Sequence, residues 1–221
     1  MKKLNFFKKL GLCALSAALC ASAFAFTACD NDKSGDDEQK QEQASLAVTE
    51  TEWDAAMKLQ FNYSFVETVT AEGQTMTMTC VFKDGVVKQN SGGADFYYQK
   101  DGDNYYAYTA TNETYSKRTI SKQEYEAYTE AFIAPFVGKF EKFAFDGTDT
   151  YSCAEITHTV VSDSYTSSLK MTDIKVKFNA DKKIASLNCN MSQMAVAEMQ
   201  YAVSIVFDYS EKTITLPQVA E

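Results

Sequence analysis

Residues 75–85 read TMTMTCVFKDG, and this stretch decides the class of fold. From Thr75 to Phe82, methionine, cysteine and phenylalanine alternate with threonine and valine. A period of two is typical of a strand that has one apolar and one polar face. Asp84-Gly85 follows at once, and this dipeptide between alternating runs indicates a β-hairpin. The stretch therefore predicts a half-buried strand that ends in a tight turn.

The same alternation recurs along the chain. It covers residues 61–65, 186–192 and 201–208, and turn signals stand at Glu72-Gly73, Asp101-Gly102 and Ala180-Asp181. In the run 169–178 the apolar residues are first odd-numbered and then even-numbered. This change of phase predicts a β-bulge near Thr172-Asp173 that bends the strand. Strands with one wet face indicate an antiparallel sheet.

Two helices are expected to interrupt the strands. Thr49–Glu52 and Ser121–Glu124 both have the pattern of a capping box. In the second helix, aromatic residues form a stripe (Tyr125, Tyr128 and Phe132), and Pro135 should end it before a short helical piece that carries Phe136, Phe140 and Phe143. The fold class expected is α+β, mainly antiparallel β: a sheet of about ten strands, an N-terminal helix and a broken central helix.

The N-terminus has the layout of a secretory signal. Four lysines precede an uncharged apolar run from Gly11 to Phe26, which is short for a membrane span of about 20 residues. The ending Phe26-Thr27-Ala28-Cys29 resembles the lipobox of bacterial lipoproteins, although Phe26 stands where that family usually has leucine. The resemblance implies cleavage before Cys29 and a diacylglyceryl group on its thiol.

Composition divides the chain into three parts. We expect a signal peptide over 1–28, the lipidated Cys29 with an acidic tether over 29–48, and one β-rich domain over 49–221. Removal of 1–28 leaves 17 of the 21 basic residues and all 30 acidic ones, a formal charge of −13. So acidic a protein repels nucleic acid and anionic lipid headgroups. Nucleic-acid binding is therefore excluded, and the lipid on Cys29 is expected to be the membrane contact.

The order of elements resembles the open half-barrel of LolA/LolB-type lipoprotein carriers. Local likenesses to lipoproteins of anaerobic Gram-positive bacteria lie at 51–56, 96–106 and 214–217. The resemblance implies a curved antiparallel sheet with helices on its concave face, able to hold an acyl chain between them. By resemblance to the sorting of Gram-negative lipoproteins, Asp30 directly after Cys29 disfavours transfer to an outer membrane, which implies a place on the outer face of the cytoplasmic membrane. The arginine with which such carriers latch the barrel has no match, because Arg118 is the only arginine.

Few residues suggest catalysis, and we expect no enzyme activity and no cofactor. His158 is the only histidine, in a strand-like run, where a surface role is the common one. It has no nearby partner for a zinc site. Ser167–Lys170 fits the S-x-x-K pattern of penicillin-binding enzymes but lacks the downstream partner motifs. A pair of carboxylates brought together by folding stays open as an enzymatic alternative.

Three cysteines fall in the predicted domain: Cys80, Cys153 and Cys189. An odd number leaves at least one thiol unpaired. Cys80 and Cys189 lie on the apolar sides of their strands, which favours buried thiols. A bridge between these two residues also stays open.

Two functions from different classes follow. The first is a binding module for a lipid or other hydrophobic ligand, with an adaptable methionine- and phenylalanine-rich lining predicted from Met76, Met78, Phe82, Met191 and Phe207. The second is a surface interaction or structural protein that uses a tyrosine-rich face, for which Tyr97 and Tyr105 are the predicted contacts.

Overall fold

The computed structural model describes residues 46–59, 62–111, 114–129, 133–161, 166–193 and 200–219. The strands within these ranges are β1 (Tyr63–Ala71), β2 (Gln74–Lys83), β3 (Val86–Ser91), β4 (Ala94–Asp101), β5 (Asn104–Thr111), β6 (Thr114–Thr119), β7 (Ala144–Phe145), β8 (Thr150–Val161), β9 (Thr166–Phe178), β10 (Ile184–Gln193) and β11 (Gln200–Asp208). The helices are α2 (Glu50–Met57), α3 (Lys122–Thr129) and two short 3-10 turns, η1 (Ala134–Phe136) and η2 (Phe140–Lys142).

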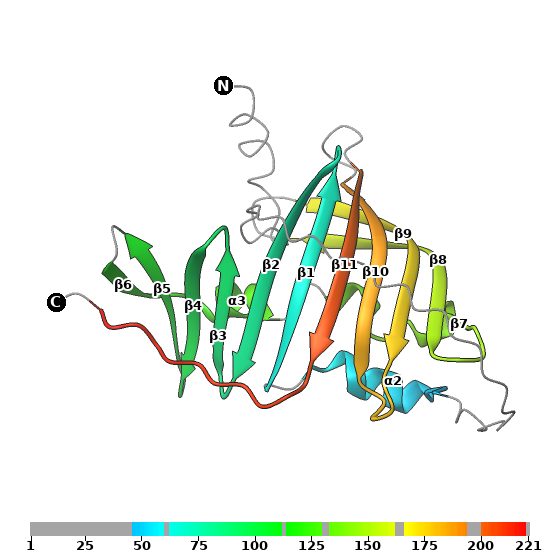
Figure 1. Cartoon of the computed structure of the whole chain (residues 1–221), viewed down its shortest axis with the longest axis horizontal. Helices are drawn as coiled ribbons and strands as arrows, with labels where there is room; N and C mark the ends of the chain where they lie inside the picture. Colours follow the sequence, from blue (N-terminus) through cyan, green and yellow to red (C-terminus); the bar gives the residue numbers. More distant parts are fainter. Residues whose placement is uncertain are drawn as a thin grey trace, which may run out of the picture.

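The described strands form one open antiparallel sheet of eleven strands, in the order β6-β5-β4-β3-β2-β1-β11-β10-β9-β8-β7. Each half of the chain builds one wing as a simple meander, and the pairing of β1 with β11 joins the two wings (Figure 1). The predicted order of elements is confirmed, with six strands before the central helical segment and five after it. The sheet is one strand larger than the ten expected.

The turns follow from the dipeptides that the sequence offers. Glu72 and Gly73 both have positive φ between β1 and β2, as do Asp84 and Gly85 between β2 and β3. Positive φ at both central residues is the geometry of the type I′ turn, which matches the twist of a hairpin. A side chain at Gly85 would meet the Lys100 carbonyl oxygen at 3.3 Å, so this glycine is also required by close packing.

The predicted bulge in β9 is confirmed. The register of β10 on β9 passes from Asn188–Lys175 to Asn190–Thr172, so β9 contains one extra residue there. Asp173 has φ +52°, and its carboxylate accepts a hydrogen bond from the Asn190 amide at 2.9 Å. Because of the extra residue, Met171 and Ile174 both point to the buried side.

The helices begin at caps that the sequence encodes. Thr49 and Glu52 form both hydrogen bonds of a capping box at the start of α2. At α3, Ser121 accepts from the Glu124 amide, but the Glu124 carboxylate pairs with Arg118 of β6 instead of closing the box. After α3 the chain forms η1 around Pro135 and then η2, as the broken-helix prediction requires. Phe132 of the predicted stripe lies outside the described residues.

An aromatic cluster fills the space between α2 and the wing of β8 and β9. Trp53 of α2 is fully buried, and its ring lies 4.6–5.8 Å from four others, those of Phe140, Phe143, Tyr151 and Phe178. Its indole N–H donates to the Phe136 carbonyl oxygen at 3.3 Å. We call Trp53 and these four ring partners the aromatic end. Buried aromatic side chains contribute much of the apolar area that stabilises a core.

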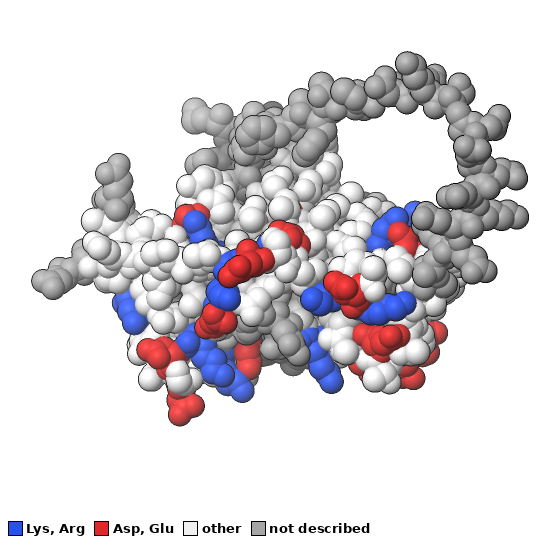
Figure 2. Space-filling view, turned by 60° about the horizontal axis from the view of Figure 1, so that its bottom comes forward, with Lys and Arg blue, Asp and Glu red and all other residues white. Residues whose placement is uncertain are grey.

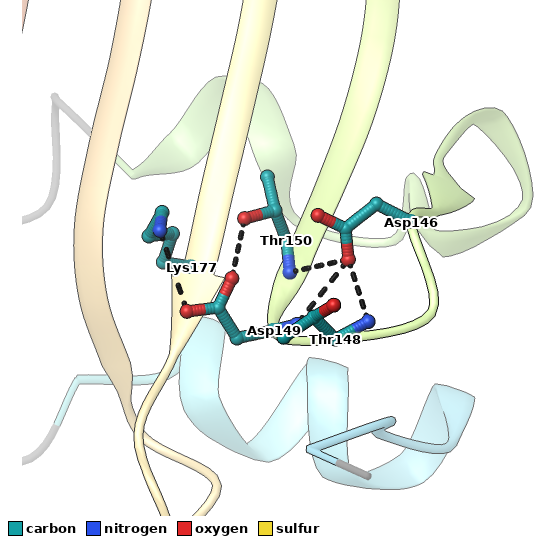
Figure 3. A network of polar contacts seen from close by, with 5 residues as sticks. All are labelled: Asp146, Thr148, Asp149, Thr150 and Lys177. Atoms are coloured by element: carbon teal, nitrogen blue, oxygen red, sulfur yellow. Dashed lines mark hydrogen bonds and ion pairs between the residues drawn. The ribbon is translucent and has the colours of Figure 1, made fainter. Parts of the chain in front are cut away.

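A polar turn fixes the start of β8 beside α2 (Figure 3). One carboxylate oxygen of Asp146 accepts from the backbone amides of Thr148, Asp149 and Thr150 at 2.8–3.2 Å. These hydrogen bonds favour the charged form and lower the pKa of Asp146. Asp149 in turn pairs with Lys177 of β9 at 3.3 Å. The turn is thus tied to the neighbouring strand by side chains as well as by the sheet.

The packed part of the chain begins before the predicted domain boundary at residue 49. Val48 is buried, and its amide and carbonyl groups both bond the Tyr151 hydroxyl. At the other end, the segment after β11 runs back along the lower ends of the strands toward β6, where Val219 pairs with Tyr115 (Figure 1). Within the described ranges, no helix is both long and apolar enough to cross a membrane. Cys29 and residues 1–28 lie outside these ranges.

Candidate functional site

The two faces of the sheet differ in what covers them. On the face toward the helices, which we call the helix-bearing face, Tyr98 of β4 stacks on Tyr128 of α3 at 3.8 Å. On the same face of the other wing, Tyr151 and Phe178 contact Trp53 of α2. All five residues predicted to line a cavity lie on the helix-bearing face: Met76, Met78, Phe82, Met191 and Phe207.

These five residues do not form one group. Phe82 and Phe207 belong to a packed aromatic set around Tyr63. The Tyr63 ring stacks on that of Phe82, with the ring centres 4.3 Å apart, and its centre lies 6.4 Å from that of Phe207. Met76 and Met78 lie farther along β2, where Met78 is only partly buried. Met191 is on β10, separated from β1 by β11. The three methionines therefore lie outside this aromatic set, Met76 buried and Met78 and Met191 partly exposed.

A carboxyl group lies on the same face, on the strand next to Met78. Glu67 follows Tyr63 and Phe65 on the apolar side of β1, and it stands directly opposite Met78 on β2 and Ile205 on β11. The row continues to Ser91 on β3, which is opposite Met78. Neighbouring strands are about 4.8 Å apart, so Glu67 and Ser91 face each other across Met78 at a backbone separation of about 10 Å.

The electrostatics of Glu67 are unusual for a glutamate. Its side chain is partly exposed, and no hydrogen bond or ion pair reaches it from another described residue. The apolar surroundings disfavour the charged form and raise the pKa of Glu67 to about 7. A carboxyl group of this kind changes its charge near neutral pH.

Two more polar groups stand beside it. Gln89 of β3 is buried opposite Cys80, and its amide donates to the Met78 sulfur at 2.7 Å. Ser91 is 2% exposed, and its hydroxyl group has no hydrogen-bond partner. A buried hydroxyl group without a partner is costly unless a ligand or water satisfies it. We call Glu67, Met78, Cys80, Gln89 and Ser91 the Glu67 site.

Burial keeps the thiols of Cys80 and Cys189, the two cysteines nearest Glu67, in their protonated form. Cys80, Cys153 and Cys189 are buried and unpaired. Burial, and then the Glu67 charge, raise the pKa of Cys189 to about 12 and that of Cys80 further. Such thiols stay protonated at neutral pH, whereas the thiolate is the reactive form. The bridge left open between Cys80 and Cys189 is wrong, because β1 and β11 lie between their strands and a disulfide needs Cα atoms within about 7 Å.

The two predicted tyrosine contacts lie on opposite faces of the sheet. Tyr97 is buried on the face away from the helices, where its ring meets Tyr115 at 5.7 Å. Tyr105 lies on the helix-bearing face, with its ring 5.2 Å from that of Tyr125 in α3. The structure therefore does not bring this pair into one surface.

The other candidates from the sequence have ordinary places. His158 is partly exposed on β8 opposite Leu169, and Lys170 of the S-x-x-K run pairs with Glu155 at 2.7 Å. Within the described ranges, no group of three or more His, Cys, Asp or Glu residues could hold a metal ion. The Glu67 site was missed, although a signal existed: in the run 63–71 the one charged residue falls in phase with the apolar positions.

Comparisons with known proteins add no family to this description. No protein-family model matches the chain, and a search of curated proteins finds no match.

Proposed function

We propose that the chain is an extracytoplasmic lipoprotein, anchored by a diacylglyceryl group on Cys29 to the outer face of the cytoplasmic membrane, that binds a lipid or other hydrophobic ligand without catalysis. One observation carries the binding role: the apolar helix-bearing face contains a few polar groups at the Glu67 site that packing leaves unsatisfied. Apolar walls with a small number of convergent polar groups are typical of ligand sites.

The architecture supports this role by analogy. We propose that the open eleven-stranded sheet, with α2 and α3 on one face, corresponds to the curved half-barrel of LolA/LolB-type carriers. In such a fold the ligand would lie between the sheet and the helices, over Met76 and Met78. Fold analogy alone does not fix function, so the ligand itself has to be recovered.

Ligand recovery is the direct test of binding. The chain from Asp30 to Glu221 keeps every described residue, and it can be purified without detergent and studied by native mass spectrometry and organic extraction. We expect a bound hydrophobic molecule of defined mass that Met78→Trp excludes, because the larger ring fills the space beside Glu67. A surface control is Val206→Trp on the opposite face, where the side chain is 55% exposed. Protein that carries no ligand and takes up none would overturn the binding role.

The anchor has its own test. In cells given radioactive palmitate, the full chain should be labelled and should enter the detergent phase on phase separation. Cys29→Ser should abolish both results, and Cys20→Ser should leave both intact, because bulky Leu19 precedes Cys20. Label that survives Cys29→Ser would rule out this cysteine as the attachment site. Support for an anchor by lipid alone comes from Figure 2, in which acidic and basic side chains are interleaved on the face shown, without a large area of either sign.

A further inference from the structure

Among the described residues, no lysine or arginine is paired with Glu67. The strands nearest to it, β1, β2, β3, β10 and β11, carry two lysines, Lys83 and Lys88. Both lie on the opposite face, since Lys83 pairs in register with Val86 and Lys88 with Val81. The one arginine, Arg118, is on β6 and is already paired with Glu124. On these five strands, no described lysine or arginine shares the face of Glu67.

The neighbours of Glu67 select among ligand headgroups. An anionic headgroup would meet the carboxylate with no cation to offset the repulsion. A neutral chain would leave both the carboxylate and the Ser91 hydroxyl unsatisfied. A protonated amine has three donors and one positive charge, so it can bond the carboxylate and the hydroxyl together. The Met78 thioether beneath it is soft and adaptable and suits the adjoining carbon chain.

We propose that the Glu67 site binds the ammonium group of an amphipathic amine, whose hydrocarbon chain lies on the apolar helix-bearing face. This inference rests on the proposed function and narrows its ligand to one chemical class. The carboxylate of Glu67 is the charge partner, and the Ser91 hydroxyl accepts a further hydrogen bond from the ammonium group. The binding is non-covalent.

The affinity should depend on pH through Glu67. The ligand amine stays protonated to about pH 10, as lysine does, whereas Glu67 ionises near pH 7. Binding should therefore strengthen from pH 5.5 to pH 8. The other titratable groups toward this face include Tyr63 on β1 itself, Tyr201 on β11, and the protonated thiols of Cys80 and Cys189. Tyr98 and Lys100 lie farther away on β4, and His158 is four strands away on β8. Glu67→Gln removes the contribution of Glu67 alone.

Three probes with the same chain separate the possibilities: dodecylamine, dodecanol and dodecanoate, each titrated below its micelle concentration into the Asp30–Glu221 chain by calorimetry. We expect dodecylamine to bind about 10–100-fold more tightly than dodecanol at pH 8, the range typical of a hydrogen-bonded charge. Dodecanoate should bind most weakly. Glu67→Gln should bring dodecylamine down to the level of dodecanol, and Ser91→Ala should weaken it severalfold.

The matched control is Glu155→Gln, the same substitution at a carboxylate on the opposite face of β8. It should leave all three affinities unchanged. Equal affinity of the wild-type chain for dodecylamine and dodecanol, or an unchanged dodecylamine affinity in Glu67→Gln, would overturn the inference and leave the proposed function standing. Failure of all three probes and of extracted lipid would overturn the proposed function as well. The pH dependence of dodecylamine affinity in the wild-type chain tests the inference without a variant: the affinity should rise from pH 5.5 to pH 8, and a constant affinity would contradict the role of Glu67.

Discussion

The aromatic end and the Glu67 site occupy the same face of one sheet and are built in opposite ways. At the aromatic end, rings from α2, η2, β8 and β9 meet within 6 Å, and the indole N–H of Trp53 has a partner. At the Glu67 site, a carboxyl group and a hydroxyl group stand among apolar side chains without partners in the described chain. The aromatic end provides a hydrogen-bond partner for the polar group of Trp53, whereas the Glu67 site leaves Glu67 and Ser91 without one among the described residues.

The difference separates stability from binding. A fully packed aromatic cluster lowers the free energy of the folded state and offers no room for a ligand. A carboxyl group on an apolar face raises that free energy, because desolvation of its charged form is uncompensated. Natural folds depart from good packing chiefly at functional sites. The comparison therefore assigns much of the stability of the domain to the aromatic end and the proposed binding to the Glu67 site.

Trp53→Ala should give the largest effect on stability. Trp53 is fully buried and touches four rings, so its removal leaves a cavity that the surroundings can only partly close. We expect a loss of about 3–5 kcal/mol in the free energy of unfolding, measured by urea denaturation. Val206→Ala, at a residue 55% exposed on the opposite face, should change it by less than about 0.5 kcal/mol. Similar losses for the two variants would show that the aromatic end does not dominate stability.

Glu67→Gln should increase the free energy of unfolding at neutral and higher pH, whereas Trp53→Ala lowers it. The pKa of Glu67 is raised from 4.5 to about 7 in the folded chain, so folding favours the protonated form. The stability from this group is complete below about pH 4.5 and is lost as the pH rises through 7. The loss is at most about 3.5 kcal/mol, at about 1.4 kcal/mol per pKa unit. The variant should therefore be more stable than the wild-type chain at pH 8 and equal to it near pH 4.5.

Urea titrations of both chains at pH 4.5, 6 and 8 provide the measurement. Glu155→Gln serves as the control, because its carboxylate is exposed and pairs with Lys170. A wild-type chain that is as stable as Glu67→Gln at every pH would show that Glu67 is solvated in the folded state. The Glu67 site would then not differ from the aromatic end in its electrostatic contribution to stability.

Much of the fold was predictable, because its signals are local. Alternation in 74–83 and 200–208, the change of phase near Asp173 and the capping box at Thr49 each depend on neighbouring residues. The pairing of β1 with β11 is not local, and no pattern in either strand specifies the other. The five residues predicted to line a cavity therefore lie on one face of the sheet but do not form one group.

Tyr151→Phe tests how the aromatic end holds the segment before α2. The Tyr151 hydroxyl accepts from the Val48 amide at 2.7 Å and donates to the Val48 carbonyl oxygen at 2.9 Å. Phenylalanine keeps the ring contacts and leaves both buried backbone groups unsatisfied, so we expect a loss of about 2 kcal/mol. Tyr115→Phe is the matched control, because its hydroxyl group makes only a 3.4 Å contact. An unchanged midpoint for Tyr151→Phe would mean that water replaces the hydroxyl group at no cost.

The smallest effect on stability is expected at the ion pair between Arg118 of β6 and Glu124, which holds α3 to the wing of β1 to β6. The two terminal guanidinium nitrogens of Arg118, Nη1 and Nη2, contact the two carboxylate oxygens of Glu124, but the Arg118 side chain is 55% exposed. Exposed pairs are screened by water and salt, so a double-mutant cycle with Arg118→Gln and Glu124→Gln should give a coupling of about 0.2–1 kcal/mol. The cycle for Lys122 and Glu126, which are more exposed, should give less. A coupling above about 2 kcal/mol would place a second stabilising centre at α3, and stability would then no longer be concentrated at the aromatic end.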